Sequence, residues 1–142
     1  MLPVSRRDCF GIARSLSLTL VLTVLPCLGQ SRLKEMTVEV PFSFAVAGQV
    51  LPAGRYMVTE MNETSLRIYS DQHGLIFATH PIQGTPPESI SKLIFHRYGR
   101  VYFLSAIWTA GNSTGRQLFP SRAEKEISQR TDSQIAELNA AP

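Results

Sequence analysis

The stretch Met36-Thr37-Val38-Glu39-Val40-Pro41-Phe42-Ser43-Phe44-Ala45-Val46 decides the fold class of this chain. Apolar side chains occupy every second position from Met36 to Val46. This strict period of two predicts a long β-strand with one buried face. Pro41 cannot donate a hydrogen bond to a neighbouring strand, so the strand is expected to lie at a sheet edge or to bend there.

Further runs of β-forming residues follow this stretch at intervals of about ten residues, separated by turn residues. They cover residues 55–61, 65–69, 75–80, 92–97 and 101–108. Tyr98-Gly99-Arg100 is expected to join the last two runs as a tight hairpin, and residues 81–91 are expected to form an exposed loop. Bulky groups on both faces of the last run predict a strand that is central or covered by another element. The pattern predicts a mainly β fold, a small antiparallel barrel or sandwich of about six or seven strands.

The C-terminal part begins with a helix signal. In Ser121-Arg122-Ala123-Glu124 the serine and the glutamate have the spacing of a capping box, in which each satisfies a backbone donor of the other. The sequence predicts one helix over about 122–130, packed across the sheet, and a polar tail over 131–142 that extends the helix or frays. The expected division is a β-domain over 30–120 and a C-terminal helix and tail over 121–142.

The N-terminus has the features of a signal peptide. Three arginines precede an apolar run over residues 16–25, which is too short for a membrane span of about 20 residues. Small residues before Gln30 favour cleavage there. We therefore predict that residues 1–29 are a signal peptide and that the chain is exported, to the periplasm or beyond the cell.

Three alternatives for this segment remain open. Ser5-Arg6-Arg7 resembles a twin-arginine signal, which would imply export of a folded protein instead of the general secretory route. Residues around Cys27 resemble a lipoprotein box, although the proline before the cysteine fits it poorly. An uncleaved N-terminus would give a protein held at the membrane. If the signal peptide is cleaved, the chain contacts the membrane only through that peptide during export.

The composition is that of a globular protein, because 44% of the 142 residues are apolar and 18% are charged. The net charge of +3 is partly that of the first segment. Without residues 1–29, eleven basic side chains face ten acidic ones, so no nucleic-acid partner is expected. Cys9 and Cys27 both lie in that segment. The exported domain therefore has no disulfide, and its core must stabilise it.

No catalytic, metal-binding or cofactor-binding pattern stands out. His73, His80 and His96 are scattered, and a zinc site needs about three convergent ligands. Ser105 is interpreted as a packing residue in a strand, and Glu124 as a helix cap.

The most suggestive surface feature is the predicted hairpin tip. Arg97, Tyr98 and Arg100 are weak binding candidates there, as donors to a carboxylate, phosphate or glycan. The structural alternative is a polar tip that keeps the sheet soluble. Trp108 and Tyr102 are expected to be core residues.

Two stretches carry a resemblance to a known group of proteins. One runs from Val40-Pro41-Phe42-Ser43-Phe44 through Leu51-Pro52-Ala53-Gly54-Arg55-Tyr56, and the other from Leu93-Ile94-Phe95-His96-Arg97-Tyr98-Gly99 to Ser121-Arg122-Ala123-Glu124. Together they resemble small exported proteins common in soil bacteria of the acidobacterial kind. The resemblance spans nearly all of the chain after the signal peptide. It implies an exported β-domain in a Gram-negative-type envelope, and it implies no activity and no catalytic residues.

The sequence thus favours a non-catalytic role in the cell envelope, either binding an unidentified ligand or envelope partner or serving a structural purpose. The alternative is a hydrolase-type enzyme whose site assembles in three dimensions around His96. A carboxylate or serine within hydrogen-bond reach of the His96 ring is the feature that this alternative requires. The ligand and the oligomeric state are not encoded in any recognisable pattern.

Overall fold

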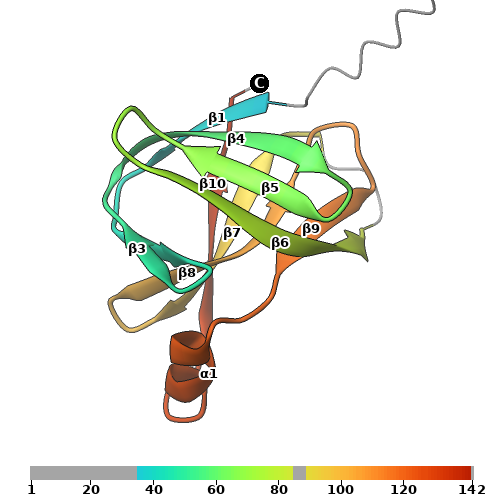
Figure 1. Ribbon diagram of the computed structural model, residues 1–142. Coiled ribbons are helices and arrows are strands. Elements are labelled where there is room, and N and C mark those ends of the chain that lie inside the picture. Colours follow the sequence, from blue (N-terminus) through green and yellow to red (C-terminus); the bar gives the residue numbers. More distant parts are fainter. Residues whose placement is uncertain (1–34, 85–88, 142) are drawn as a thin grey trace, which may run out of the picture. The chain divides into compact units, whose positions relative to one another are not determined.

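The computed structural model describes residues 35–84 and 89–141. The chain divides into two units, Met1–Gln30 and Ser31–Pro142, and every described residue belongs to the second. The predicted signal peptide therefore lies outside the described residues. The described part is mainly β with one short helix (Figure 1), which confirms the mainly β part of the fold prediction.

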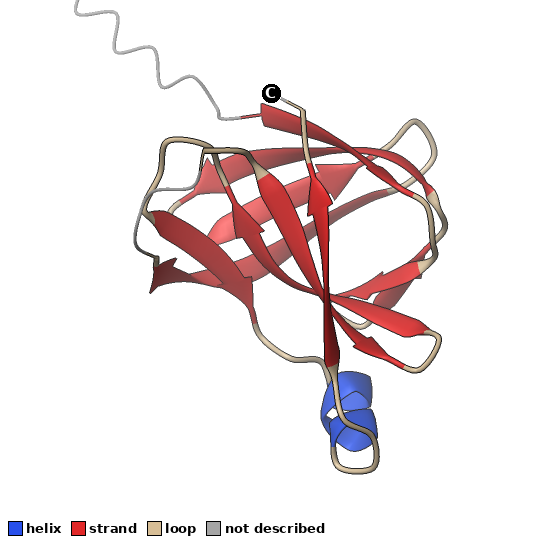
Figure 2. Ribbon diagram, turned by 180° about the vertical axis from the view of Figure 1, so that it is seen from behind, coloured by secondary structure: helices blue, strands red, loops and turns tan. Residues whose placement is uncertain are grey.

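The described part contains ten strands instead of the predicted six or seven. In chain order the elements are β1 (Glu35–Val40), β2 (Phe44–Val46), β3 (Gln49–Leu51), β4 (Gly54–Asn62), β5 (Ser65–Tyr69), β6 (Gly74–Gln83), β7 (Lys92–Tyr98), β8 (Val101–Trp108), β9 (Thr114–Leu118), α1 (Arg122–Ser128) and β10 (Gln134–Asn139). Figure 2 shows the same elements from behind, with α1 beyond one end of the strands.

The long first strand is in fact two strands. The chain leaves β1 at Pro41, which removes a backbone donor, and resumes as β2 at Phe44. A tight turn then leads into β3, because Ala47 and Gly48 both have positive φ values of 48° and 86°. Two positive values in succession are the geometry of the hairpin turn that matches the twist of β-strands.

Strand β6 is longer than predicted and takes in the first residues of the expected loop. Its far end, Thr79–Gln83, pairs with β9, whereas β5 pairs only with Gly74–Ala78. Pro81 is tolerated inside this strand because one edge of β6 has no β5 partner at that point. None of the predicted strand runs covers the residues of β9.

The ten strands form one open sheet, so the barrel, one of the two predicted architectures, is wrong. The sheet is also not wholly antiparallel as predicted, because β2 pairs with β8 in parallel. The strand order is β1-β4-β5-β6-β9-β8-β2-β3, with β7 pairing to β8 and β10 pairing to β7. The sheet curls so that β1 approaches the end of β10 (Figure 1). Within residues 35–84 and 89–141 one bridge joins these ends, between Thr37 of β1 and Ala141 just after β10, with two backbone hydrogen bonds of 2.9 and 2.8 Å. A single bridge is not the ladder that closes a barrel.

One concave core stabilises the sheet. It consists of alternating side chains from most strands, as the period of two predicts. Its largest fully buried members include Tyr56, Phe44, Phe95, Ile68 and Leu93. The rings of Phe44 and Phe95 lie edge to face at 5.5 Å, an arrangement that aromatic side chains favour.

Strand β8 contains a bulge that explains its bulky groups on two faces. The register between β7 and β8 shifts by one residue: Ile94 pairs with Ala106, whereas the next residue, Phe95, pairs with Leu104. Ser105 therefore has no partner in β7. The extra residue lets Leu104 and Ile107 both enter the core although they are three positions apart. The strand is central, as expected, because it pairs with β7, β9 and β2.

The helix starts where predicted but ends at Ser128, and it lies beyond one end of the strands instead of across the sheet (Figure 2). The tail does not extend it. Ser121 accepts a hydrogen bond of 3.2 Å from the Glu124 backbone N–H, which is one half of the predicted capping box. Ile127 packs against a small second cluster formed by Ala45, Tyr98 and Phe103, so α1 covers the outer side of the β7–β8 hairpin. The predicted helical or frayed tail is instead strand β10.

Candidate functional site

The predicted tip residues Arg97, Tyr98 and Arg100 are adjacent in sequence but not in the structure. Tyr98 pairs with Val101, so the hairpin turn is tight, as predicted. Arg97 and Arg100 are exposed, whereas Tyr98 is buried. Neighbouring residues of a strand point to opposite faces, and the structure therefore does not bring the three side chains together.

Arg97 is held by its own hairpin. Its Nε donates a hydrogen bond of 2.8 Å to the Gly99 carbonyl, and its guanidinium lies 5.6 Å from the centroid of the Tyr102 ring. Phe42 stacks on that ring, with 3.7 Å between the centroids. Anion binding by Arg97 and Arg100 stays a prediction.

Tyr98 belongs to the covered side of the hairpin. Burial raises the pKa of its phenol above the ordinary value of 10.0, and the charge of Glu124 raises it further, while a hydrogen bond with Ser133 lowers it. Its ring lies edge to face with that of Phe103 at 5.8 Å. This environment suits a packed phenol and not a surface donor for ligand.

The three histidines lie apart, in different surroundings. His80 contacts Gln117 at 3.1 Å through Nε2 and lies 4.8 Å from the Phe119 ring. His73 lies in the turn between β5 and β6. Within residues 35–84 and 89–141 no three side chains of His, Cys, Asp or Glu gather as metal ligands.

His96, in contrast, has two partners that sequence reasoning did not connect with it. Its Nδ1 lies 2.8 Å from Glu124 Oε1, and its Nε2 lies 3.1 Å from Ser105 Oγ. A carboxylate accepts hydrogen bonds only, so Nδ1 carries the proton in the neutral ring, and Nε2 accepts from the Ser105 hydroxyl. We call these three residues the His96 cluster.

The His96 cluster was missed because its members lie on three elements. Ser105 is nine residues from His96 and Glu124 is twenty-eight. Ser105 approaches the ring from the bulge in β8, which no period of two reveals. The capping box did place Glu124 at the start of α1, but it predicted that the carboxylate would cap the helix instead of binding a histidine on the sheet.

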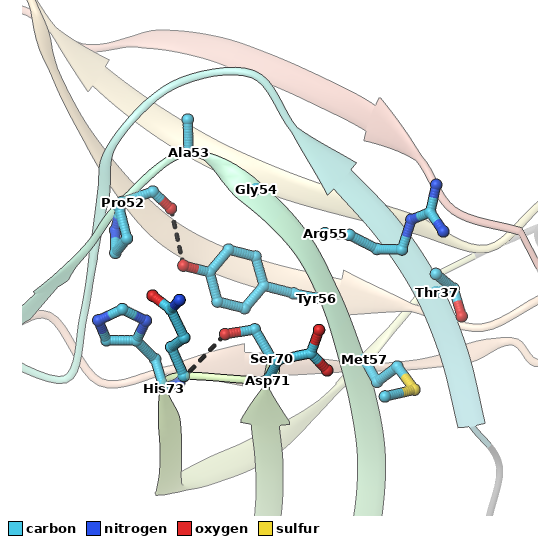
Figure 3. A pocket seen from close by; sticks show the side chains of 11 residues that line it. Thr37, Pro52, Ala53, Gly54, Arg55, Tyr56, Met57, Ser70, Asp71 and His73 are labelled. Atoms are coloured by element: carbon cyan, nitrogen blue, oxygen red, sulfur yellow. Dashed lines mark hydrogen bonds between the residues drawn. The ribbon is translucent and has the colours of Figure 1, made fainter.

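A groove of about 600 Å³ lies elsewhere on the sheet (Figure 3). One wall is the turn Pro52–Gly54 between β3 and β4, the other is the turn Ser70–His73, and residues 55–57 of β4 lie between them. Met57 pairs with Tyr69 across β4 and β5. That register brings the second turn, which follows Tyr69, next to the first.

Both walls of the groove are fixed by hydrogen bonds. The Tyr56 hydroxyl donates to the Pro52 carbonyl at 2.7 Å, and burial raises the pKa of this phenol, so it stays a neutral donor at physiological pH. The Ser70 backbone N–H donates to the His73 carbonyl at 2.7 Å, and the His73 N–H donates to Ser70 Oγ at 3.2 Å. A groove with fixed walls is suited to binding, because little freedom is lost when a ligand enters.

The lining of the groove combines donors and acceptors of both charges. Arg55 and Asp71 contribute opposite charges, and Gln72 and His73 add an amide and an imidazole. The nearest ion-pair partner of Arg55 is Glu39 at 3.7 Å, and both side chains are largely exposed. Such a pair contributes little stability, so the guanidinium remains available to a ligand. Sequence reasoning missed this site because its residues come from two turns and a strand.

The comparisons with known proteins add no family. Neither a scan against protein-family models nor searches of curated proteins and solved structures find a match for this chain. The resemblance to exported acidobacterial proteins therefore stays a prediction. Among the helices of the described ranges, none has the length and hydrophobicity needed to cross a bilayer.

Proposed function

We propose that the chain is an exported protein of the cell envelope whose β-domain binds a small polar ligand in the groove between Pro52–Gly54 and Ser70–His73. The observation that supports the binding role most directly is the groove itself, with a volume of about 600 Å³. This is within the range of small-molecule sites, roughly 300–1,000 Å³. Export is supported by the signal-like features of residues 1–29.

The ligand class follows from the charges in the groove. The guanidinium of Arg55 and the carboxylate of Asp71 have opposite signs, so the lining favours neither an anion nor a cation. Side chains that both donate and accept hydrogen bonds, together with the apolar ring of Pro52, match a neutral polyhydroxyl molecule. An oligosaccharide fragment of the envelope has this chemistry.

The binding experiment is a nuclear magnetic resonance titration with soluble oligosaccharides released from a bacterial envelope. Amide signals of residues 52–57 and 70–73 should shift in a saturable manner, and the Arg55→Ala and Asp71→Ala variants should lose most of the response. Arg122→Ala is the matched control, because Arg122 is also a largely exposed, ion-paired arginine but lies on α1. Equal loss in the control, or shifts spread evenly over the sheet, would reject the groove as the binding site.

The export experiment is independent of the ligand. Mass spectrometry of the protein recovered from a producing cell should find a chain that begins near Gln30. A chain that keeps residues 1–29 would show that the N-terminus is an anchor and not a cleaved signal.

A further inference from the structure

The His96 cluster has the bonding pattern of an activated nucleophile. A nucleophilic serine needs a base within about 2.6–3.2 Å of its oxygen, and the base needs a third group that orients it. Ser105 Oγ lies 3.1 Å from His96 Nε2, and Glu124 Oε1 lies 2.8 Å from Nδ1. The order serine, imidazole, carboxylate therefore matches a hydrolytic triad in geometry, which is how such sites are recognised.

Each member of the cluster is held by a regular element. His96 lies on β7 between the buried residues Phe95 and Tyr98. Glu124 lies in the first turn of α1, whose start is fixed by the bond from its own backbone N–H to Ser121. Sites built on strands and helices keep their geometry better than sites built on loops.

The bulge gives Ser105 an unusual position. It has no partner in the registers of β8 with β7, with β9 or with β2. The extra residue of a bulge is left out of the ladder, and bulges often re-aim a side chain next to an active site. In this chain the bulge directs the Ser105 hydroxyl toward the His96 ring, to which it is hydrogen-bonded.

The three members of the His96 cluster differ in their exposure to solvent. Glu124 is 5% exposed and Ser105 is 7% exposed, whereas the His96 side chain is 30% exposed. The orienting charge is thus shielded from water, where its effect on the imidazole is stronger. The imidazole of the base remains partly exposed to solvent.

We propose that Ser105 is a nucleophile that accepts acyl groups from small uncharged esters, with His96 as its general base and Glu124 as the residue that positions the imidazole. The substrate class follows from the neighbours of the ring. Ile135 faces His96 across β10 and β7 and is 69% exposed, so a short apolar acyl chain has a surface to lie on. The buried negative charge of Glu124 disfavours an anionic substrate.

The reaction balances without any further reactant except water. Ser105 Oγ attacks the ester carbonyl carbon, and His96 Nε2 takes the hydroxyl proton as the new carbon–oxygen bond forms. The bond to the leaving alkoxide then breaks, and the imidazole returns the proton to it as an alcohol. Water attacks the acyl carbon next while His96 Nε2 takes its proton. The bond between that carbon and Ser105 Oγ then breaks, and the imidazole gives the proton to Oγ. The products are an acid, an alcohol and the free serine.

The first test is covalent labelling of the full chain with a fluorophosphonate, followed by peptide mass spectrometry. We expect one adduct, on Ser105, and its loss in His96→Gln. Ser128→Ala is the matched control, because Ser128 is an exposed serine on α1 whose hydroxyl donates to the Lys125 carbonyl at 2.9 Å. It should label as the natural chain does. An unlabelled Ser105 in the folded natural chain would overturn the proposal without any variant.

The second test is steady-state hydrolysis of p-nitrophenyl acetate, butyrate and palmitate. Acetate and butyrate should be cleaved and palmitate should not, and Ser105→Ala should abolish turnover. Glu124→Gln should lower kcat by about 100-fold, within the range of base catalysis, and leave KM unchanged, because glutamine keeps a hydrogen-bond acceptor but loses the charge. If Glu124→Gln lowers the melting temperature but leaves kcat unchanged, the cluster only fastens α1 to the sheet and the proposal is wrong.

Discussion

The single tryptophan of the chain is buried, as predicted, and provides a sharp test of the packing around it. Trp108 is 8% exposed, and its indole lies against the backbones of Gly84 and Gly115. A Cβ atom added to Gly115 would lie 2.7–2.8 Å from three ring carbons, and one added to Gly84 would lie 2.5 Å from another. Carbon atoms in proteins keep about 3.5–4.0 Å, so any side chain at these glycines must displace the ring.

The expected cost of Gly115→Ala follows from two opposing effects. Overpacking a well-filled site costs about 1–3 kcal/mol. Replacing glycine by alanine also restricts the unfolded chain, which stabilises the fold by about 0.4–1 kcal/mol. The difference is a net loss centred on roughly 1.3 kcal/mol, within a span of about 0–2.6 kcal/mol, and the central value corresponds to a fall of about 5–10 °C in melting temperature for a domain of this size.

Tryptophan fluorescence measures the displacement directly, because the chain has one tryptophan. In Gly115→Ala the emission should move to longer wavelength as the ring leaves its buried position, and the thermal midpoint should fall. Gly74→Ala is the matched control, since its added Cβ would meet Tyr69 at an ordinary 3.7 Å. If Gly115→Ala has the same melting temperature as Gly74→Ala and the same emission wavelength as the natural chain, the indole does not rest on these glycines and the reasoning is refuted.

Three further predictions concern the hairpin, the buried phenol and the last strand. The double change Arg97→Ala and Arg100→Ala should weaken retention on an anionic or glycan resin and leave the melting temperature almost unchanged. If retention and melting temperature both fall, the two arginines have a structural role. Because burial raises the pKa of Tyr98, its neutral form contributes stability that is present below about pH 10 and is lost as pH rises through the raised value. The free energy of unfolding should therefore fall less steeply at alkaline pH in Tyr98→Phe than in the natural chain. An equal fall in both proteins would show that the Tyr98 phenol does not have a raised pKa. Leu138→Ala should cost about 1–2 kcal/mol in urea unfolding, since this side chain of β10 is partly buried against the core, whereas the exposed Ile135→Ala should cost almost nothing.

The sequence predicts elements whose signal is local and misses those that depend on a neighbour. β5 was predicted with its bounds, because alternating residues lie between two turn signals. β10 was not predicted, because Gln134–Asn139 is polar and short. It becomes a strand by pairing with the free edge of β7, and tertiary pairing of this kind overrides weak local preference.

The candidate sites follow the same division. Arg97, Tyr98 and Arg100 were grouped because they are neighbours in sequence, and the strand geometry then separated the phenol from the guanidinium groups. His96 was recognised as the centre of a possible site, but its partners were interpreted as a packing serine and a helix cap. Sequence separation of this kind conceals a site unless a motif of fixed spacing marks it.

The bulge in β8 is the feature that links the fold to the His96 cluster. In a strand without the extra residue, Leu104 and Ala106 would share one face, and Ile107 would turn away from the core. The bulge therefore serves the packing of Ile107, although the irregularity has its own cost in lost pairing. What the bulge adds is the approach of the Ser105 hydroxyl to within 3.1 Å of His96. One irregularity thus serves two ends: it brings Ile107 into the core, and it completes a serine–histidine–carboxylate contact of the kind that bulges create next to active sites. The labelling of Ser105 and the kcat of Glu124→Gln separate a chemical role of that contact from a structural one.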